Sequence, residues 1–177
     1  MNNAWTQTIG VNHNGSDEWY TPRNAVEPLI KYLYPGSKIL CPFDTEESEY
    51  VKVFRENGFN VSFGHISTGQ DFFKLERKDI DADYIISNPP FSLRDKILER
   101  LVEFRIPFAM LFNANGLFDS KKRFELAKYY DFSVIYLSPR VRYIDSLGNR
   151  NSPPFQSAYI TMGITPRRLY FERIENV

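Results

Sequence analysis

The chain has 177 residues, of which 42% are hydrophobic and 25% charged, a composition typical of one globular domain. One cysteine, Cys41, excludes an internal disulfide, and two histidines, His13 and His65, are too few for a Cys/His zinc cluster. Basic and acidic residues number 22 each, so net charge favours no particular partner. The apolar run 106–112 is too short for a bilayer, and the polar N-terminus resembles no signal peptide. A cytoplasmic protein without membrane or metal partners is expected.

Residues 1–16 are rich in Asn and Gly and lack periodicity, so they are expected to form a loose arm before a single domain over 17–177. Apolar spacing, caps and turn residues predict helices and strands along this domain. In chain order the predicted elements are a helix over 22–34, a strand over 38–43, a helix over 45–57 with Thr45 as N-cap, strands over 59–63 and 83–87, a helix over 92–104, a strand over 108–112, a helix over 120–128, and strands over 132–137, 141–144 and 158–162.

Strands that alternate with helices predict parallel βαβ units, and the short connections near the C-terminus predict a closing antiparallel hairpin. The fold class is therefore α/β, with a mostly parallel sheet. Ligands of such sheets bind at the carboxyl ends of the strands. The loops after Phe43, Phe63, Ser87 and Phe112 are therefore where chemistry is expected.

The most informative motif is Asn88-Pro89-Pro90-Phe91, at the end of the strand predicted over 83–87. Two successive prolines fix the backbone and remove two N–H donors, and the residue before a proline is held extended. The corner would present an amide side chain, a main-chain carbonyl and an aromatic ring, which together suit a planar amine. The alternative is a rigid turn between strand and helix without a chemical role.

The tetrapeptide Asn-Pro-Pro-Phe after a strand resembles the catalytic motif of amino-methyltransferases that depend on S-adenosylmethionine. Further segments, in the right order over roughly residues 17–165, resemble small phage Dam-type DNA N6-adenine methyltransferases. These segments are Asp17-Glu18-Trp19-Tyr20-Thr21-Pro22, Phe43-Asp44, Gly69-Gln70-Asp71-Phe72-Phe73, Arg140-Val141-Arg142-Tyr143-Ile144 and Ser152-Pro153-Pro154-Phe155-Gln156-Ser157-Ala158.

The resemblance implies a Rossmann-like class I methyltransferase with helices on both faces of the sheet and no separate target-recognition domain. It implies methyl transfer from S-adenosylmethionine to the N6 of an adenine flipped out of DNA, in the host cytoplasm if the enzyme is phage-encoded. Asn88, Pro89, Pro90 and Phe91 would be catalytic, with Phe91 stacked on the base. The expected cofactor-binding residues are Trp19, Tyr20, Thr21, Pro22, Asp44, His65, Asp71 and Phe72. Monomer and homodimer both remain open.

Two departures from the family's pattern keep other functions open. The loop 41–48 lacks the usual glycines, and His65 stands where an acidic residue usually binds ribose. One alternative is a catalytically weak or inactive binding protein of the same fold, such as a phage anti-defence or nucleic-acid-binding module. Another is an enzyme that acts on RNA or on a protein glutamine. Plain structural roles also remain open, namely loop or cap positions for Thr21, Asp44 and Asp71 and a surface position for His65.

Basic residues are unevenly distributed: residues 1–93 hold 8 basic and 13 acidic residues, whereas residues 94–177 hold 14 and 9. The C-terminal half is therefore the better candidate to face a polyanion. The candidate phosphate contacts are Lys121, Lys122, Arg123, Arg140, Arg142 and Arg150. A solvated basic surface is the alternative.

Overall fold

The computed structural model describes residues 20–144, 150–151, 153–166 and 168–175, so the predicted arm over 1–16 lies outside them. The first half contains α2 (Arg23–Val26), η1 (Glu27–Tyr32), β1 (Lys38–Cys41), α3 (Glu49–Glu56), β2 (Asn60–Phe63), η2 (Ile66–Thr68), η3 (Phe72–Lys74), η4 (Arg77–Asp79) and β3 (Tyr84–Ser87), where η marks a 3-10 helix. The second half contains η5 (Phe91–Leu93), α4 (Arg94–Phe104), β4 (Phe108–Asn113), α5 (Lys121–Tyr129), β5 (Phe132–Ser138), β6 (Tyr143–Ile144), β7 (Arg150–Asn151), β8 (Ser157–Met162) and β9 (Leu169–Arg173).

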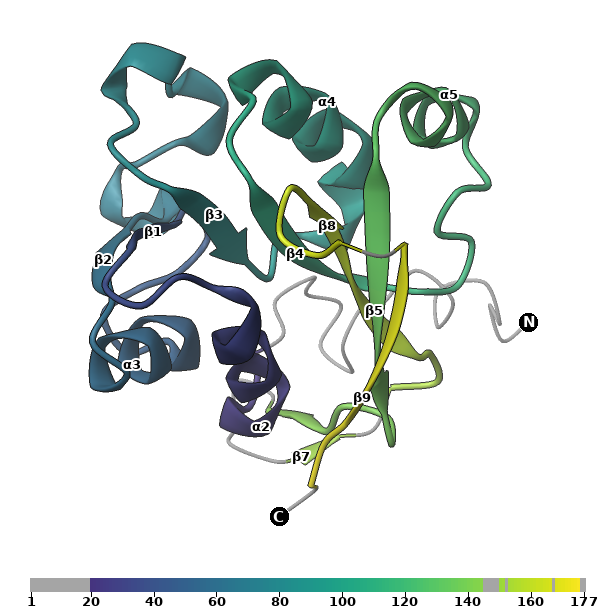
Figure 1. Cartoon of the computed structure of the whole chain (residues 1–177), viewed down its shortest axis with the longest axis horizontal. Helices are drawn as coiled ribbons and strands as arrows, with labels where there is room; N and C mark the ends of the chain where they lie inside the picture. The colour runs from purple at the N-terminus through teal and green to yellow at the C-terminus, as the bar shows by residue number, and fades with distance from the viewer. Residues whose placement is uncertain (1–19, 145–149, 152, 167, 176–177) are drawn as a thin grey trace.

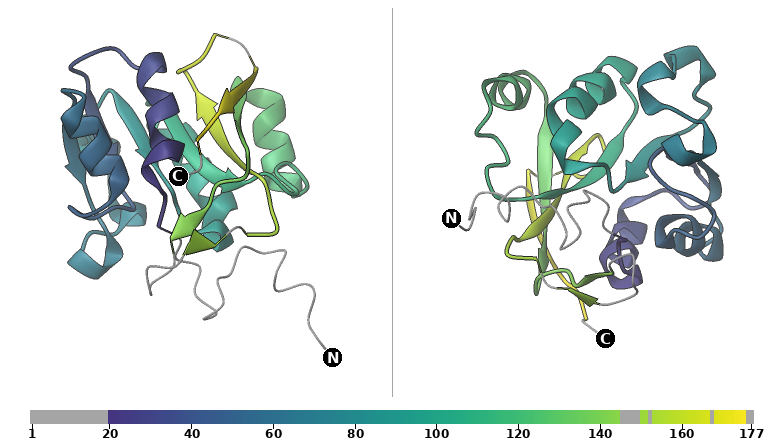
Figure 2. Two further views of the ribbon diagram at one scale, coloured as in Figure 1. Left: turned by 90° about the horizontal axis from the view of Figure 1, so that it is seen from below. Right: turned by 180° about the vertical axis from the view of Figure 1, so that it is seen from behind.

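Seven strands form one sheet in the order β2-β1-β3-β4-β8-β5-β9. The strands from β2 to β4 pair in parallel, whereas β8 runs antiparallel to both β4 and β5, and β9 is parallel to β5. Helices α2 and α3 lie on one face of the sheet, and α4 and α5 lie on the other (Figure 1; Figure 2). The predicted class, a mostly parallel α/β sheet with antiparallel strands near the C-terminus, is confirmed.

The core is centred on β3 and β4, in which every residue is buried. A buried polar link ties the two halves of the chain together: the Tyr50 and Tyr159 hydroxyls lie 2.8 Å apart, and the Tyr159 hydroxyl donates to the Ala25 carbonyl at 2.9 Å. Buried hydroxyls require such partners, so this link fixes α2 and α3 against β8. No helix of the described residues is long and apolar enough to cross a membrane.

The prediction of one α-helix over 22–34 is wrong for its second half. The α-helix ends at Val26 and continues as the 3-10 helix η1, in which Pro28 occupies one of the first two positions. Proline has no N–H for an α-helical bond and restricts the residue before it, so the tighter 3-10 form follows.

The helix predicted over 45–57 begins later, at Glu49, with Ser48 rather than Thr45 as N-cap. The Thr45 N–H donates to Ser48 Oγ and the Ser48 N–H donates to the Thr45 carbonyl, each at 3.0 Å, so these residues close a turn. As a result, the segment from Pro42 to Ser48 stays in a loop at the carboxyl end of β1.

Strand β9 was not predicted.

Candidate active site

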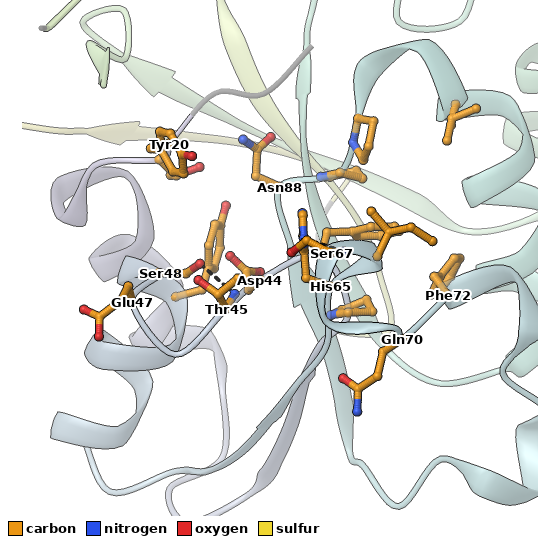
Figure 3. Close-up of a pocket in the computed structure, with 18 of the residues that line it drawn as sticks. Tyr20, Asp44, Thr45, Glu47, Ser48, His65, Ser67, Gln70, Phe72 and Asn88 are labelled. Carbon is orange, nitrogen blue, oxygen red and sulfur yellow. Dashed lines mark hydrogen bonds between the residues drawn. The ribbon is translucent and has the colours of Figure 1, made fainter. Parts of the chain in front are cut away.

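A cavity of about 730 Å³ lies at the carboxyl ends of β1, β2 and β3. Its walls come from the loops that follow these strands and from the start of α3, together with Tyr20, Thr21 and Ile144 (Figure 3). Three of the four loops expected to hold chemistry therefore meet in one place. The loop after β4 does not line this cavity.

Asp44 is the buried carboxylate of the cavity wall, with 6% of its surface exposed. Its Oδ2 accepts a hydrogen bond from the Ser87 hydroxyl, which sits at the end of β3, one residue before Asn88. Burial raises the pKa of Asp44 to about 7, while hydrogen bonds from Ser87 and Ser48 oppose the rise. The site thus contains a carboxyl group that changes charge near neutral pH.

The loop after β1 is tied to the end of β2 by two main-chain hydrogen bonds. The Gly64 N–H donates to the Cys41 carbonyl and the Asp44 N–H donates to the Gly64 carbonyl, each at 3.0 Å. A Cβ at Gly64 would collide with the side chain of Gln70. Glycine at this position therefore leaves room for the Gln70 side chain beside the end of β2.

The corner after β3 places Asn88, Pro89 and Pro90 in the cavity wall. Asn88 is half-buried, and Figure 3 shows it near Tyr20. An amide side chain, a rigid backbone and a buried carboxyl group therefore share one cavity.

No protein-family model and no curated protein sequence matches the chain, so the comparison rests on solved structures.

Three similar structures come from type I restriction systems, and this chain spans about half the length of each. A chain assigned as the modification subunit of a type I restriction enzyme of Vibrio vulnificus has a TM-score of 0.52 and 12% identity, over 90% of this chain and 48% of that one. A component of a type I restriction-modification system has a TM-score of 0.51 and 11% identity, over 97% of this chain and 48% of that one. The M protein of the type I enzyme EcoKI has a TM-score of 0.50 and 11% identity, over 89% of this chain and 49% of that one.

The chain has the Rossmann-like fold of S-adenosylmethionine-dependent methyltransferases. Within the methyltransferase fold, the structure brings together most of the residues expected to bind the cofactor. Tyr20, Thr21, Asp44, His65, Asp71 and Phe72 line the cavity. Pro22 is buried as the N-cap of α2 and does not line it, and Trp19 lies outside the described residues.

Thr21 carries a buried hydroxyl group in the cavity wall. It is 7% exposed, lines the cavity, and its Oγ1 has no hydrogen-bond partner among the described residues. Tyr20 next to it is held in place by Ile144, since each N–H donates to the other's carbonyl at 3.1 and 3.0 Å. A buried hydroxyl without a partner costs free energy unless a ligand satisfies it.

Asp71 and Phe72 begin the short helix η3. The Asp71 Oδ1 accepts from the Phe73 N–H at 2.9 Å, so one of its oxygens caps the helix and the other is left for a ligand. The Phe72 ring lies 4.9 Å from that of Phe43 and 5.8 Å from that of Phe104, and only 3% of Phe72 is exposed. Phe72 therefore belongs mainly to the core, although it also lines the cavity.

Phe91 departs from the expectation that it stacks on a base. It is 5% exposed, does not line the cavity, and its ring lies 5.6 Å from Phe155 and 6.4 Å from Phe112. In this structure it anchors the corner in the core. Among the described aromatic residues that line the cavity, Tyr20 is the most exposed, with 53% of its surface accessible.

Two of the basic residues expected to bind phosphates, Arg123 and Lys122, have protein partners. The Arg123 side chain donates to the Leu117 carbonyl at 2.7 Å, to the Gly116 carbonyl at 3.0 Å, and to Asp95. Lys122 pairs with Glu99 at 2.9 Å. These contacts organise the loop after β4. Lys121, Arg140 and Arg142 are exposed, and the side chain of Arg150 lies outside the described part of the chain.

Sequence reasoning missed several cavity residues. Thr45, Glu47, Ser48 and Glu49 had been placed in a helix, and Ser48 could have been found as a second N-cap candidate. Ser67 enters through a 3-10 turn that was not predicted, whereas Ile144 ends the strand predicted over 141–144 and was not assigned to the site. In the part of the chain that the structure describes, no group of His, Cys, Asp or Glu is placed to hold a metal ion.

Proposed function

We propose that this protein transfers a methyl group from S-adenosylmethionine to the exocyclic N6 of a flipped adenine in DNA. The observation that carries the proposal is the position of the Asn88-Pro89-Pro90 corner, which shares one cavity with Asp44, Asp71 and Thr21 at the carboxyl ends of the strands. The methyltransferase fold places its ligands at this edge of the sheet.

The cavity residues fit the parts of S-adenosylmethionine. Asp44 would bind the ammonium group and the unsatisfied Thr21 hydroxyl would donate to the carboxylate, since both groups are buried and both line the cavity. The free oxygen of Asp71 would accept from the adenine amine of the cofactor, next to the rings of Phe72 and Phe43. The bound cofactor supplies an electrophilic methyl group on a sulfonium.

The chain's own contribution to the reaction is positioning. The Asn88 Oδ1 and the Pro89 carbonyl would accept the two N–H groups of the target amine, which directs its lone pair into the cavity. Two prolines hold these acceptors rigid. No strong base is required, because the amine proton becomes acidic once the nitrogen is methylated. A fixed orientation of the two reacting atoms then accounts for most of the catalysis.

The test is transfer of a labelled methyl group to unmethylated DNA, with digestion to identify N6-methyladenine. Asn88→Ala should lower the transfer rate about a hundredfold, the scale expected when a reacting group loses its orientation. Asn60→Ala is the matched control, because Asn60 is exposed on the edge strand β2. Absence of label in adenine, or equal activity of Asn88→Ala and Asn60→Ala, contradicts the proposal.

A second candidate substrate is the side-chain amide of a protein glutamine, which offers the same planar N–H₂ group. It is favoured by the absence of Lys and Arg from the described cavity wall, which instead carries Asp44, Glu47, Glu49 and Asp71. Phosphates are not attracted to such a wall. The same labelled cofactor incubated with RNA and with glutamine-containing peptides distinguishes these substrates from DNA.

A further inference from the structure

Strand β9 forms one edge of the sheet, since β5 is its only neighbour among the described strands (Figure 1). The Val134 N–H donates to the Arg168 carbonyl at 2.8 Å, and the Ile174 N–H donates to the Ser138 carbonyl at 2.7 Å. Alternate residues of a strand direct their main-chain groups to the same side. The even-numbered residues of β9 therefore bond to β5, and the odd-numbered residues point their N–H and C=O groups away from the sheet.

The outward groups belong to Leu169, Phe171 and Arg173, and they bond to no other described residue. Three such residues in a row offer a template for a further strand. Edge strands are often protected by a proline or by a charged residue at the centre. Strand β9 has the sequence Leu-Tyr-Phe-Glu-Arg, with Phe171 at its centre, and lacks both devices.

The side chains of β9 divide between two faces of the sheet. On one face the Tyr170 ring lies 5.4 Å from the Tyr32 ring, and Lys31 pairs with Glu172 at 2.8 Å. The 3-10 helix η1 thus covers this face of the strand and holds it in place. Because side chains alternate along a strand, the odd-numbered residues face the opposite side.

The opposite face is apolar and open. Leu169 is in register with Val134, and Phe171 with Tyr136. The Phe171 and Tyr136 rings stack 5.8 Å apart, yet 73% of the Phe171 surface is exposed. An apolar strip that continues to an unpaired strand edge is typical of an interaction surface.

We propose that β9 pairs with β9 of a second copy of this chain, antiparallel, about a twofold axis at Phe171. Phe171 then lies opposite the partner's Phe171, and Leu169 lies opposite the partner's Arg173. A twofold interface must be self-complementary, and this strand meets that condition. Each of these pairs exchanges two main-chain hydrogen bonds, because the groups of all three residues point outward.

Charge favours this register and a second copy as the occupant. In it Tyr170 lies opposite the partner's Glu172, and no like charges oppose each other. A shift by two residues in one direction would place Glu172 opposite the partner's Glu172, and like charges directly opposite are destabilising. A shift in the other direction would leave Arg173 outside the pairs that β9 forms with itself. Since β9 has five residues, the interface is smaller than the usual value of about 1,600 Å², and a dissociation constant in the micromolar range is expected.

The dimer keeps the two cavities apart. Strands β4, β5 and β9 run in the same direction, so antiparallel pairing of β9 turns the carboxyl ends of the two sheets to opposite sides. Loss of the dimer should therefore leave ligand binding in each cavity unchanged. The inference stands or falls independently of the proposed function.

The first test is analytical ultracentrifugation of the whole chain over a range of concentrations, with a reversible monomer–dimer equilibrium as the expected result. Phe171→Lys should weaken dimerisation about a hundredfold or more, because it places two ammonium groups opposite each other. Tyr34→Lys is the matched control. Tyr34 is 79% exposed, and its N–H contacts the Tyr84 hydroxyl of β3 at 3.5 Å, away from β9. The control should dimerise like the wild type.

The second test reads the register from disulfide formation under mild oxidation. The native Cys41 is buried and does not interfere. Phe171→Cys should form a covalent dimer by itself, since residues opposite each other have Cα atoms about 5.5 Å apart. Leu169→Cys and Arg173→Cys should each remain monomeric, because four residues along the strand, about 14 Å, separate the two copies of each cysteine. A mixture of these two variants should cross-link.

A protein that stays monomeric up to about 0.5 mM overturns the inference, and so does a dimer that Phe171→Lys leaves intact. Cross-linking of Leu169→Cys alone, or none of Phe171→Cys, also overturns it. The midpoint of thermal unfolding of each variant shows that the fold is retained, and the wild-type concentration series gives the result without any substitution.

Discussion

Replacement of Asp44 by asparagine tests the buried carboxyl group at the centre of the site. Burial raises the pKa of Asp44 from its ordinary value of 3.8 to about 7. In the folded protein the group therefore keeps its proton up to about pH 7, whereas in the unfolded chain it ionises near pH 4. Stability is thus fully present below pH 4 and is lost as the pH rises toward 7. At about 1.36 kcal/mol per pKa unit the loss amounts to roughly 4 kcal/mol, as an upper value.

Asparagine is nearly the same size as aspartate, cannot ionise, and can still accept from the Ser87 hydroxyl. Asp44→Asn should therefore raise the free energy of unfolding at pH 8 by about 2 to 4 kcal/mol and change it little at pH 4.5. Urea unfolding at the two pH values measures the difference. Asp79→Asn is the control, because Asp79 is exposed and should leave the pH profile unchanged. A destabilised Asp44→Asn protein at pH 8 would refute the reasoning.

The affinity for a ligand with an ammonium group should rise with pH, whereas the contribution of Asp44 to stability falls. A ligand ammonium group favours the ionised form of Asp44, so at pH 6 binding must first remove a proton. Affinity for S-adenosylhomocysteine should fall about tenfold from pH 8 to pH 6 in the wild type, as expected for one group that titrates near pH 7. In Asp44→Asn the affinity should be low and its pH dependence flat. An unchanged affinity in the variant would remove Asp44 from the binding site.

Three other predictions concern the residues around the cavity. Gly64→Ala should lower the free energy of unfolding by about 1 kcal/mol, because its Cβ displaces Gln70, and the double variant Gly64→Ala/Gln70→Ala should recover most of the loss. Phe91→Ala should cost about 3 to 5 kcal/mol in denaturant unfolding, as a core residue does, whereas Phe91→Leu should leave DNA affinity within about twofold. Arg123→Met should lower stability by about 2 kcal/mol with DNA affinity unchanged; a loss of affinity in filter binding without a loss of stability would return this residue to the phosphate-binding surface.

The α/β class and the place of the site were predictable because both depend on strong local signals. Short apolar runs bounded by turn residues mark β1, β3 and β4, and Rossmann topology then places the loops after them together. The Asn88 corner was predictable for the same reason, since two prolines leave the backbone few conformations. Asp44 was expected at the site because Phe43-Asp44 resembles the cofactor loop of the methyltransferases.

The orientation of side chains within these loops was not predictable. Phe91 follows the proline corner and would be exposed if the loop stood clear of the sheet, but the long-range packing of Phe155 covers it. Arg123 begins a helix, and only the fold of the loop after β4 reveals the carbonyls that it binds. Strand β9 alternates exposed and half-buried residues and pairs with β5, for example Leu169 with Val134, 35 positions earlier in the chain.

The most direct test of the account is a crystal structure of the protein with S-adenosylhomocysteine. The account predicts the amino group of the ligand within hydrogen-bonding distance of Asp44, its adenine at Asp71, and its sulfur facing the Asn88 side chain. A ligand bound elsewhere, or a sulfur atom turned away from Asn88, would contradict it.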